Sequence, residues 1–140
     1  MKKVKIYKLT HEAIKPYGFI IDSRCVKDKG YGNDFGVLLK AKSNGWRVGY
    51  LIVRDRVIKR LENHPDSLET FEPTEGKLVI AFAPLSKPDE VKVFLLDKPV
   101  VVKKHVWHEV AALSKRAEVK IFENIEVGVG YHHLKDVIKV

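Results

Sequence analysis

The sequence contains one cysteine, one methionine and no long uninterrupted apolar stretch. Cys25 is the only cysteine, so an internal disulfide is excluded, as is usual for proteins of a reducing compartment. The first ten residues, MKKVKIYKLT, alternate lysine with apolar residues and lack the apolar centre of a signal peptide or a membrane span. We therefore expect a cytoplasmic protein that does not enter a membrane.

Blocks of like charge are also missing, although the chain is basic. It has 26 Lys and Arg against 18 Asp and Glu, a formal net charge of +8. A basic surface can attract nucleic acid, an anionic membrane or a small anionic substrate. The lysines are spread among acidic residues, and there is no aromatic-rich basic stripe of the kind that stacks bases, so we expect no nucleic-acid partner.

Helical periodicity is scarce, and short strand patterns dominate. Apolar runs alternate with turn residues about every eight to twelve positions, which predicts an all-β sandwich or closed barrel with little helix. The run KLVIAFA at 77–83 is almost wholly apolar and predicts a strand covered on both faces. With no linker, internal repeat or low-complexity segment, residues 1–140 are expected to form a single domain.

Three local features predict how the chain turns. Thr10 is expected to cap a short helical turn. An Asn-Gly pair at 44–45 lies between two apolar runs, which predicts a hairpin of 35–42 with 46–54. The tail, 124–140, can cross to another subunit.

Residues with catalytic or metal-binding chemistry occur in two distant stretches. LENHPDSLETFEPTEG at 61–76 places His64 and Glu69 on either side of a turn, and KKHVWHEV at 103–110 adds His108. An imidazole and a carboxylate on facing strands suit a divalent metal or an acid–base pair. Two alternatives stay open: His64 is a turn residue before Pro65, and His108 is a core histidine bonded to a backbone carbonyl.

Three segments, in this order, resemble the ureidoglycolate lyase (ureidoglycolate hydrolase) family of the cupin superfamily. They are LTHEAIKPYGFIID at 9–22, LENHPDSLETFEPTEG at 61–76 and HVWHEV at 105–110. The resemblance implies a cupin-like β-barrel of the double-stranded β-helix or jelly-roll type, usually a homodimer. It also implies an enzyme of allantoin and purine breakdown that splits ureidoglycolate into glyoxylate and urea.

The same resemblance implies roles for individual residues. His64, Glu69 and His108 fall on the pocket-facing signature, and Glu62 lies where the first histidine of a metal-binding cupin would be. His64 or His108 is then the base or acid, with Glu69 orienting an imidazole. Alternatively, His64, Glu69 and His108 hold a divalent ion such as Mn, Ni, Zn or Fe; no organic cofactor is expected.

A small anionic substrate needs positive charge to hold its carboxylate, and Lys103, Arg54 and Arg60 are the candidates for this role. The sequence departs from the family at Asn63, Glu69 and Lys103, where the family has an arginine, commonly a glutamine, and a histidine. These departures favour a second function, a metal-binding cupin that acts on a sugar or a keto acid. A non-enzymatic basic binding module is the third.

Overall fold

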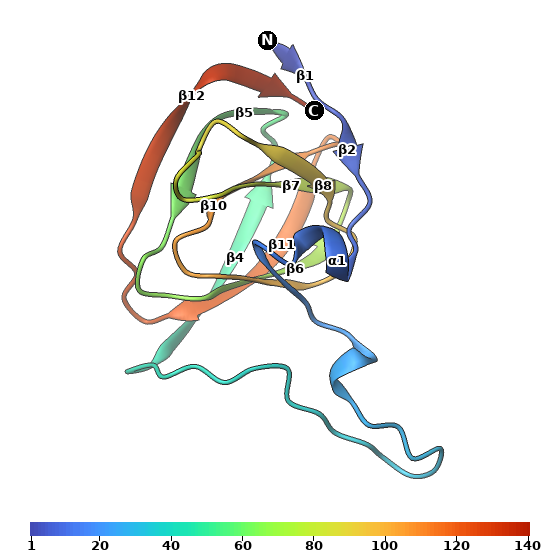
Figure 1. The fold of residues 1–140 in the computed structure, drawn as a ribbon. Helices are drawn as coiled ribbons and strands as arrows, with labels where there is room; N and C mark the ends of the chain where they lie inside the picture. The colour runs from blue at the N-terminus through green and yellow to red at the C-terminus, as the bar shows by residue number, and fades with distance from the viewer.

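The computed structural model describes all 140 residues and contains twelve strands and two short helices (Figure 1). In chain order these are β1 Lys2–Lys3, β2 Ile6–Tyr7, α1 His11–Ile14, β3 Gly18–Ile20, the 3-10 helix η1 Ser23–Cys25, β4 Trp46–Val53, β5 Val57–Asn63, β6 Glu69–Glu75, β7 Leu78–Ala83, β8 Lys92–Leu95, β9 Val100–Val102, β10 Trp107–Ala112, β11 Ala117–Asn124 and β12 Gly130–Lys139. Neither helix has the length or the apolar character needed to cross a membrane.

The strands form two curled sheets. The larger has the order β1-β12-β5-β10-β7-β8-β2, and the smaller has the order β3-β9-β6-β11-β4. Neighbours are antiparallel except for β1 beside β12 and β2 beside β8, which are parallel. This arrangement confirms the prediction of an all-β barrel of the jelly-roll type with little helix.

Apolar side chains fill the space between the sheets and also cover the outside of the larger sheet. All six residues of β7 are buried, which confirms the prediction for the run at 77–83. The even-numbered side chains of β7 belong to the core between the sheets, and the odd-numbered ones pack in a second cluster with Ile58 and Ile138. Alternation of side chains along a strand explains why a doubly covered strand is continuously apolar.

The first turn of helix is present where it was predicted. The Thr10 hydroxyl accepts a hydrogen bond from the Ala13 amide at 3.2 Å and caps α1. The alternating segment before it, residues 4–9, supplies only the two-residue strand β2. Val4 packs against the second cluster whereas Leu9 lies in the core between the sheets, so this segment changes sides instead of continuing as one strand.

The hairpin predicted around the Asn-Gly pair is wrong. Gly45 does adopt a positive φ of 143°, but residues 35–42 form no strand and β4 pairs only with β11. Residues 27–44, here called the arm, leave the barrel after η1 and return to it at β4 (Figure 1). A turn signal sets the local direction of the backbone, but it does not decide which surface the flanking apolar run will cover.

The C-terminal tail, which was expected to be able to cross to another subunit, is paired within its own chain in this structure. It forms β12, which pairs antiparallel with β5 of the same chain and also holds β1. Ile138 is 3% exposed and anchors the strand in the second cluster.

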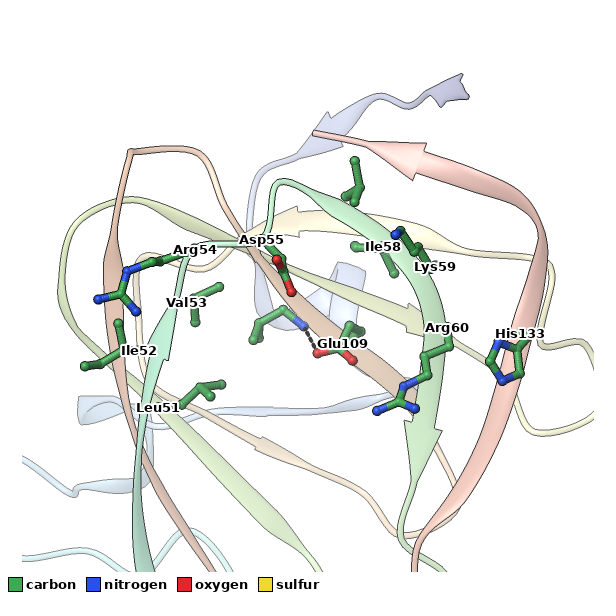
Figure 2. Close-up of a pocket in the computed structure, with 12 residues that line it drawn as sticks. Leu51, Ile52, Val53, Arg54, Asp55, Ile58, Lys59, Arg60, Glu109 and His133 are labelled. Carbon is green, nitrogen blue, oxygen red and sulfur yellow. Dashed lines mark hydrogen bonds between the residues drawn. The ribbon is translucent and has the colours of Figure 1, made fainter.

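The barrel is open between β4 and β5. A cleft of about 530 Å³ lies there, and Figure 2 shows Glu109 and Arg60 reaching into it from β10 and β5. The cleft exists because β5 and β10 pair only at His108 and Glu62 and separate beyond that point. It is lined by Leu51, Ile52, Val53, Arg54, Asp55, Val57, Ile58, Lys59, Arg60, Glu109, Val110 and His133.

Candidate metal centre

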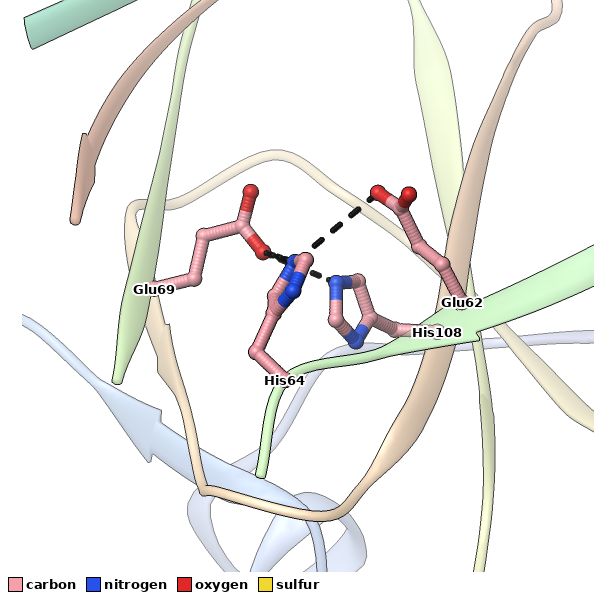
Figure 3. A group of neighbouring side chains, drawn as sticks. All are labelled: Glu62, His64, Glu69 and His108. Carbon is pink, nitrogen blue, oxygen red and sulfur yellow. Dashed lines mark hydrogen bonds and ion pairs between the residues drawn. The ribbon is translucent and has the colours of Figure 1, made fainter. Parts of the chain in front are cut away.

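Four side chains from three strands converge inside the barrel. Glu62 lies on β5, His64 follows the end of that strand, Glu69 begins β6 and His108 lies on β10 (Figure 3). One ligand atom from each residue lies within 4.8 Å of the others. The structure thus brings together His64, Glu69 and His108, which the sequence separates by up to 44 positions, and adds Glu62 to them.

A tight turn after β5 sets this geometry. β5 ends at Asn63, Pro65 lies in the turn that follows, and Glu69 begins the returning strand β6. The Asp66 carboxylate accepts a hydrogen bond from the Gly128 amide at 3.1 Å, which ties the turn to the segment before β12. The Gly128 carbonyl in turn lies 3.0 Å from Nδ1 of His64, so the turn and the tail together orient this imidazole.

Both imidazoles are held in the same tautomer. Nδ1 of His64 lies against the Gly128 carbonyl, and Nδ1 of His108 lies 2.9 Å from the Val106 carbonyl. A carbonyl oxygen can only accept, so Nδ1 carries the proton in each ring. In the neutral form, Nε2 of each ring then offers a lone pair to the interior, as metal-binding histidines do.

Both Nε2 atoms face one carboxylate oxygen. Oε2 of Glu69 lies 2.7 Å from Nε2 of His64 and 2.9 Å from Nε2 of His108. The contact with His64 lacks the alignment of a hydrogen bond, which leaves this buried Nε2 without a hydrogen-bond partner. Such an atom is rare in a protein interior, and a metal ion supplies the partner that it lacks.

The shared carboxylate changes the protonation of the cluster. Burial alone would lower the pKa of His64, but the ion pair with Glu69 outweighs it and raises that pKa to about 9. Burial also lowers the pKa of His108, which is fully buried, but its contact with Glu69 outweighs burial and raises that pKa. Burial alone would raise the pKa of Glu69, but His108 and His64 outweigh it and lower that pKa to about 2.

The donor set fits a divalent metal ion. Two imidazole nitrogens and two carboxylates, with no thiolate, suit Mn, Fe, Ni or Zn. Only Glu62 among the four has a substantially exposed side chain, at 30%. The cluster can therefore hold a metal ion. A small molecule from solvent can reach that ion on the side where Glu62 is exposed.

The stability of the metal-free protein should depend on pH through this cluster. His64 has a folded pKa of about 9 against a usual 6.5, so its contribution is complete below pH 6.5 and is lost as the pH rises through about 9. Glu69 has a folded pKa of about 2 against 4.5, so its contribution is complete above pH 4.5 and is lost as the pH falls through about 2. Urea unfolding of metal-stripped protein is expected to give the highest midpoint between these limits, at about pH 4.5–6.5.

A Glu69→Gln variant is the control for this pH dependence. It removes the charge that both imidazoles face, so the decline of the urea midpoint between pH 6.5 and pH 9 should become shallower. A wild-type midpoint that rises over this interval would contradict the assignment.

No member of the cluster lines the cleft, but one face of β5 and β12 connects the two. Tyr131 and His133 of β12 lie opposite Glu62 and Arg60 of β5, so these four side chains share a face. The guanidinium of Arg60 lies over the Tyr131 ring at 4.4 Å. Arg60 therefore lies two residues along β5 from a member of the cluster.

The three basic residues expected to bind an anion have different positions. Arg54 and Arg60 both line the cleft (Figure 2). Lys103 lines neither the cleft nor the cluster: its ammonium donates to the Lys15 carbonyl at 2.7 Å and lies over the Phe19 ring. The structure thus brings the two arginines, but not the lysine, to the open side of the barrel.

Glu109 is a polar group of the cleft that the sequence reading missed. Burial raises the pKa of Glu109 to about 7, and its carboxylate accepts a hydrogen bond from the Val110 amide at 2.9 Å. Its position next to His108, in an otherwise apolar run, is the one signal in the sequence that points to it.

The chain thus combines a jelly-roll barrel with a buried imidazole–carboxylate cluster that can hold a metal ion. Solved structures agree on the fold. RmlC from Streptococcus suis, in complex with dTDP-D-xylose, has a TM-score of 0.54 at 16% identity over 87% of this chain and 73% of its own. The capsular polysaccharide assembling protein CapF from Staphylococcus aureus has a TM-score of 0.53 at 18% identity over 79% of this chain.

A cupin 2 domain-containing protein from Halorhodospira halophila aligns over 69% of the chain at 14% identity, with a TM-score of 0.47. The chain spans 31% of CapF and 62% of the cupin 2 domain-containing protein, less than two thirds of either. No protein-family model matches the sequence, and no curated protein matches it significantly. The chain has the cupin fold, and these likenesses do not single out the ureidoglycolate lyases.

Proposed function

We propose that the chain is a metal-dependent cupin enzyme that acts on a small anionic molecule, a keto or hydroxy acid, bound in the cleft. The proposal rests on two imidazoles held in one tautomer against a shared carboxylate, His64 and His108 around Glu69. We further propose that the enzyme is a single-domain homodimer of the cytoplasm, which the single free cysteine fits.

Each group of the site has a role that follows from its position. His64, His108 and Glu69 would hold the divalent ion, which would supply polarisation of the substrate's hydroxyl or carbonyl oxygen. Arg54 and Arg60 bind the substrate carboxylate, for which a guanidinium offers paired donors.

Glu62 is the cluster member with the most exposed side chain, at 30%, and so can pass a proton between substrate and solvent. Its Oε1 atom lies 4.0 Å from Nε2 of His64, at the edge of the cluster.

Ureidoglycolate is the specific candidate that the three matching segments favour. It carries a carboxylate, a hydroxyl and a ureido nitrogen on one carbon, and its cleavage to glyoxylate and urea removes the hydroxyl proton and protonates the departing nitrogen. The arrangement meets these needs with cleft arginines for the carboxylate and Glu62 for the proton. Sugar nucleotides are the second candidate, favoured by the structural likeness to RmlC bound to dTDP-D-xylose.

Arg60 should decide whether an anionic ligand binds. A panel of keto acids, hydroxy acids including ureidoglycolate, and dTDP-sugars can be ranked by thermal shift of manganese-loaded protein. We expect a carboxylate to give the largest stabilisation, and Arg60→Ala to weaken its binding about tenfold or more, the loss of one charge-assisted pair. Arg24→Ala is the matched control, because Arg24 is an exposed arginine on η1 outside the cleft.

The candidates can then be told apart by turnover. Release of glyoxylate from ureidoglycolate, lost in Arg60→Ala and retained in Arg24→Ala, establishes the lyase. Stabilisation by another carboxylate without glyoxylate release keeps the metal-dependent keto acid enzyme and rejects the lyase. A largest stabilisation by a dTDP-sugar that Arg60→Ala leaves unchanged contradicts the proposal.

A further inference from the structure

The free edge of β4 and the arm are two unpaired parts of the same chain. β4 pairs with β11 on one edge and has no neighbour on the other. Only Val53 of its eight residues is buried, while Trp46 is 69% exposed and Tyr50 is 57% exposed. A long, apolar, unpaired edge strand is a template for pairing with another chain.

The arm is an apolar segment that has no strand partner within its own chain. No backbone-to-backbone hydrogen bond involves any of its residues 27–44. It contains the apolar run FGVLLKAK at 35–42, in which Phe35 is 90% exposed and Val37 is 53% exposed. This run is the one that the Asn-Gly pair marks as the partner of β4, yet it does not lie on the β4 of its own chain.

We propose that two copies of the chain exchange arms, so that residues 35–42 of each copy pair along the free edge of β4 in the other. The sequence pattern predicts that residues 35–42 pair with β4, and this pairing is absent within a single copy. The exchange forms the same pairing between two copies. The contact is reciprocal and closes after two copies, as a two-fold dimer requires. The arm has 18 residues and can span about 60 Å when extended, which is ample reach.

The exposed apolar area is sufficient for a stable dimer. At roughly 150–250 Å² for each aromatic side chain, the exposed parts of Trp46, Tyr50 and Phe35 offer on the order of 400 Å² per copy. Reciprocal burial doubles this value, and the aliphatic residues Val48 and Val37, each more than half exposed, add to it. The total reaches about 1,200 Å², the lower range of specific interfaces.

The exchanged arm also completes the cleft. Leu51, Ile52 and Val53 all line the cleft, and consecutive residues point to opposite faces of a strand, so the cleft lies along an edge of β4. Because β11 occupies the other edge, this edge is the free one. An arm paired there forms a wall of the partner copy's cleft, whatever ligand the cleft takes.

Light scattering after size-exclusion chromatography tests the exchange. We expect the wild-type chain to give twice its mass of 16.0 kDa, and the double variant Phe35→Asp, Val37→Asp to give 16.0 kDa at the same concentration. The matched control is Leu85→Asp, because Leu85 is also 53% exposed but lies on the loop after β7. A monomeric wild type, or a dimer that survives the double variant, overturns the proposal.

Cross-linking shows whether the pairing occurs between copies. In a Cys25→Ser background, protein carrying Lys40→Cys is mixed with protein carrying Val48→Cys, and a short bifunctional thiol reagent is added. We expect a covalent product of two chains that contains one peptide from each variant. A product that forms only within one chain carrying both substitutions would show an ordinary hairpin and overturn the exchange. Circular dichroism of each variant confirms that it is folded.

Discussion

Metal-stripped protein carrying His108→Ala is expected to bind a divalent ion such as Mn²⁺ at least about 100-fold more weakly than the wild type. Loss of an outer hydrogen-bond partner of a metal ligand already costs roughly 10–100-fold in affinity, so loss of a ligand costs more. His108 is 1% exposed and its Nε2 lies 2.9 Å from Glu69, so no side chain outside the cluster can take its place. Isothermal titration calorimetry gives the affinity directly.

The control is His132→Ala, which removes an imidazole that also faces a carboxylate. Nε2 of His132 lies 3.2 Å from Asp89, but this pair lies outside the cluster on the other face of β12. His64→Ala is the independent second variant and should weaken binding like His108→Ala. Unchanged Mn²⁺ binding in either cluster variant, with folding verified by circular dichroism, would reject the metal centre.

Replacing Glu69 by alanine is expected to lower the free energy of unfolding of the metal-free protein by about 3–5 kcal/mol at pH 6, the usual cost of removing one partner of a buried ion pair. The Glu69 side chain is 5% exposed and is the counter-charge of two buried imidazoles. At pH 6 these imidazoles must either stay charged without a partner or lose their protons. Urea unfolding measures the difference.

Glu69→Gln separates the charge from the packing, because it keeps the volume of the side chain. It should lose most of the same stability at pH 6. The control Glu72→Ala removes a carboxylate on the same strand, whose contact with Lys120 is exposed and 3.7 Å long, and should change stability by no more than about 0.5 kcal/mol. A Glu69→Gln protein as stable as the wild type would show that the carboxylate does not hold the imidazoles.

Much of this architecture follows from local patterns. The doubly buried β7 and the capped turn at Thr10 were both predicted from the local sequence pattern. His64 and His108 were identified from the spacing of His64 and Glu69 across a turn, from a second histidine in a distant stretch and from the resemblance to a known family. Their two carbonyl partners could not be predicted, since these depend on how the turn and the tail meet.

Other features depend on tertiary packing that a one-dimensional pattern does not contain. Glu109 lies half-buried in the cleft where β5 and β10 diverge after a single residue pair, and the sequence gives no sign of that divergence. The prediction for the arm was wrong because its apolar run fits a hairpin in the sequence but pairs with no strand of its own barrel. Lys103 follows a strand of the core and turns its ammonium to the Lys15 carbonyl, away from the cluster.

Anomalous X-ray scattering from crystals of manganese-loaded protein tests the central claim most directly. We expect one strong peak per chain between Nε2 of His64, Nε2 of His108 and the Glu69 carboxylate, with Glu62 within reach. A peak elsewhere, such as in the acidic hollow around Asp66 and Glu126, or no peak within the barrel, would contradict it.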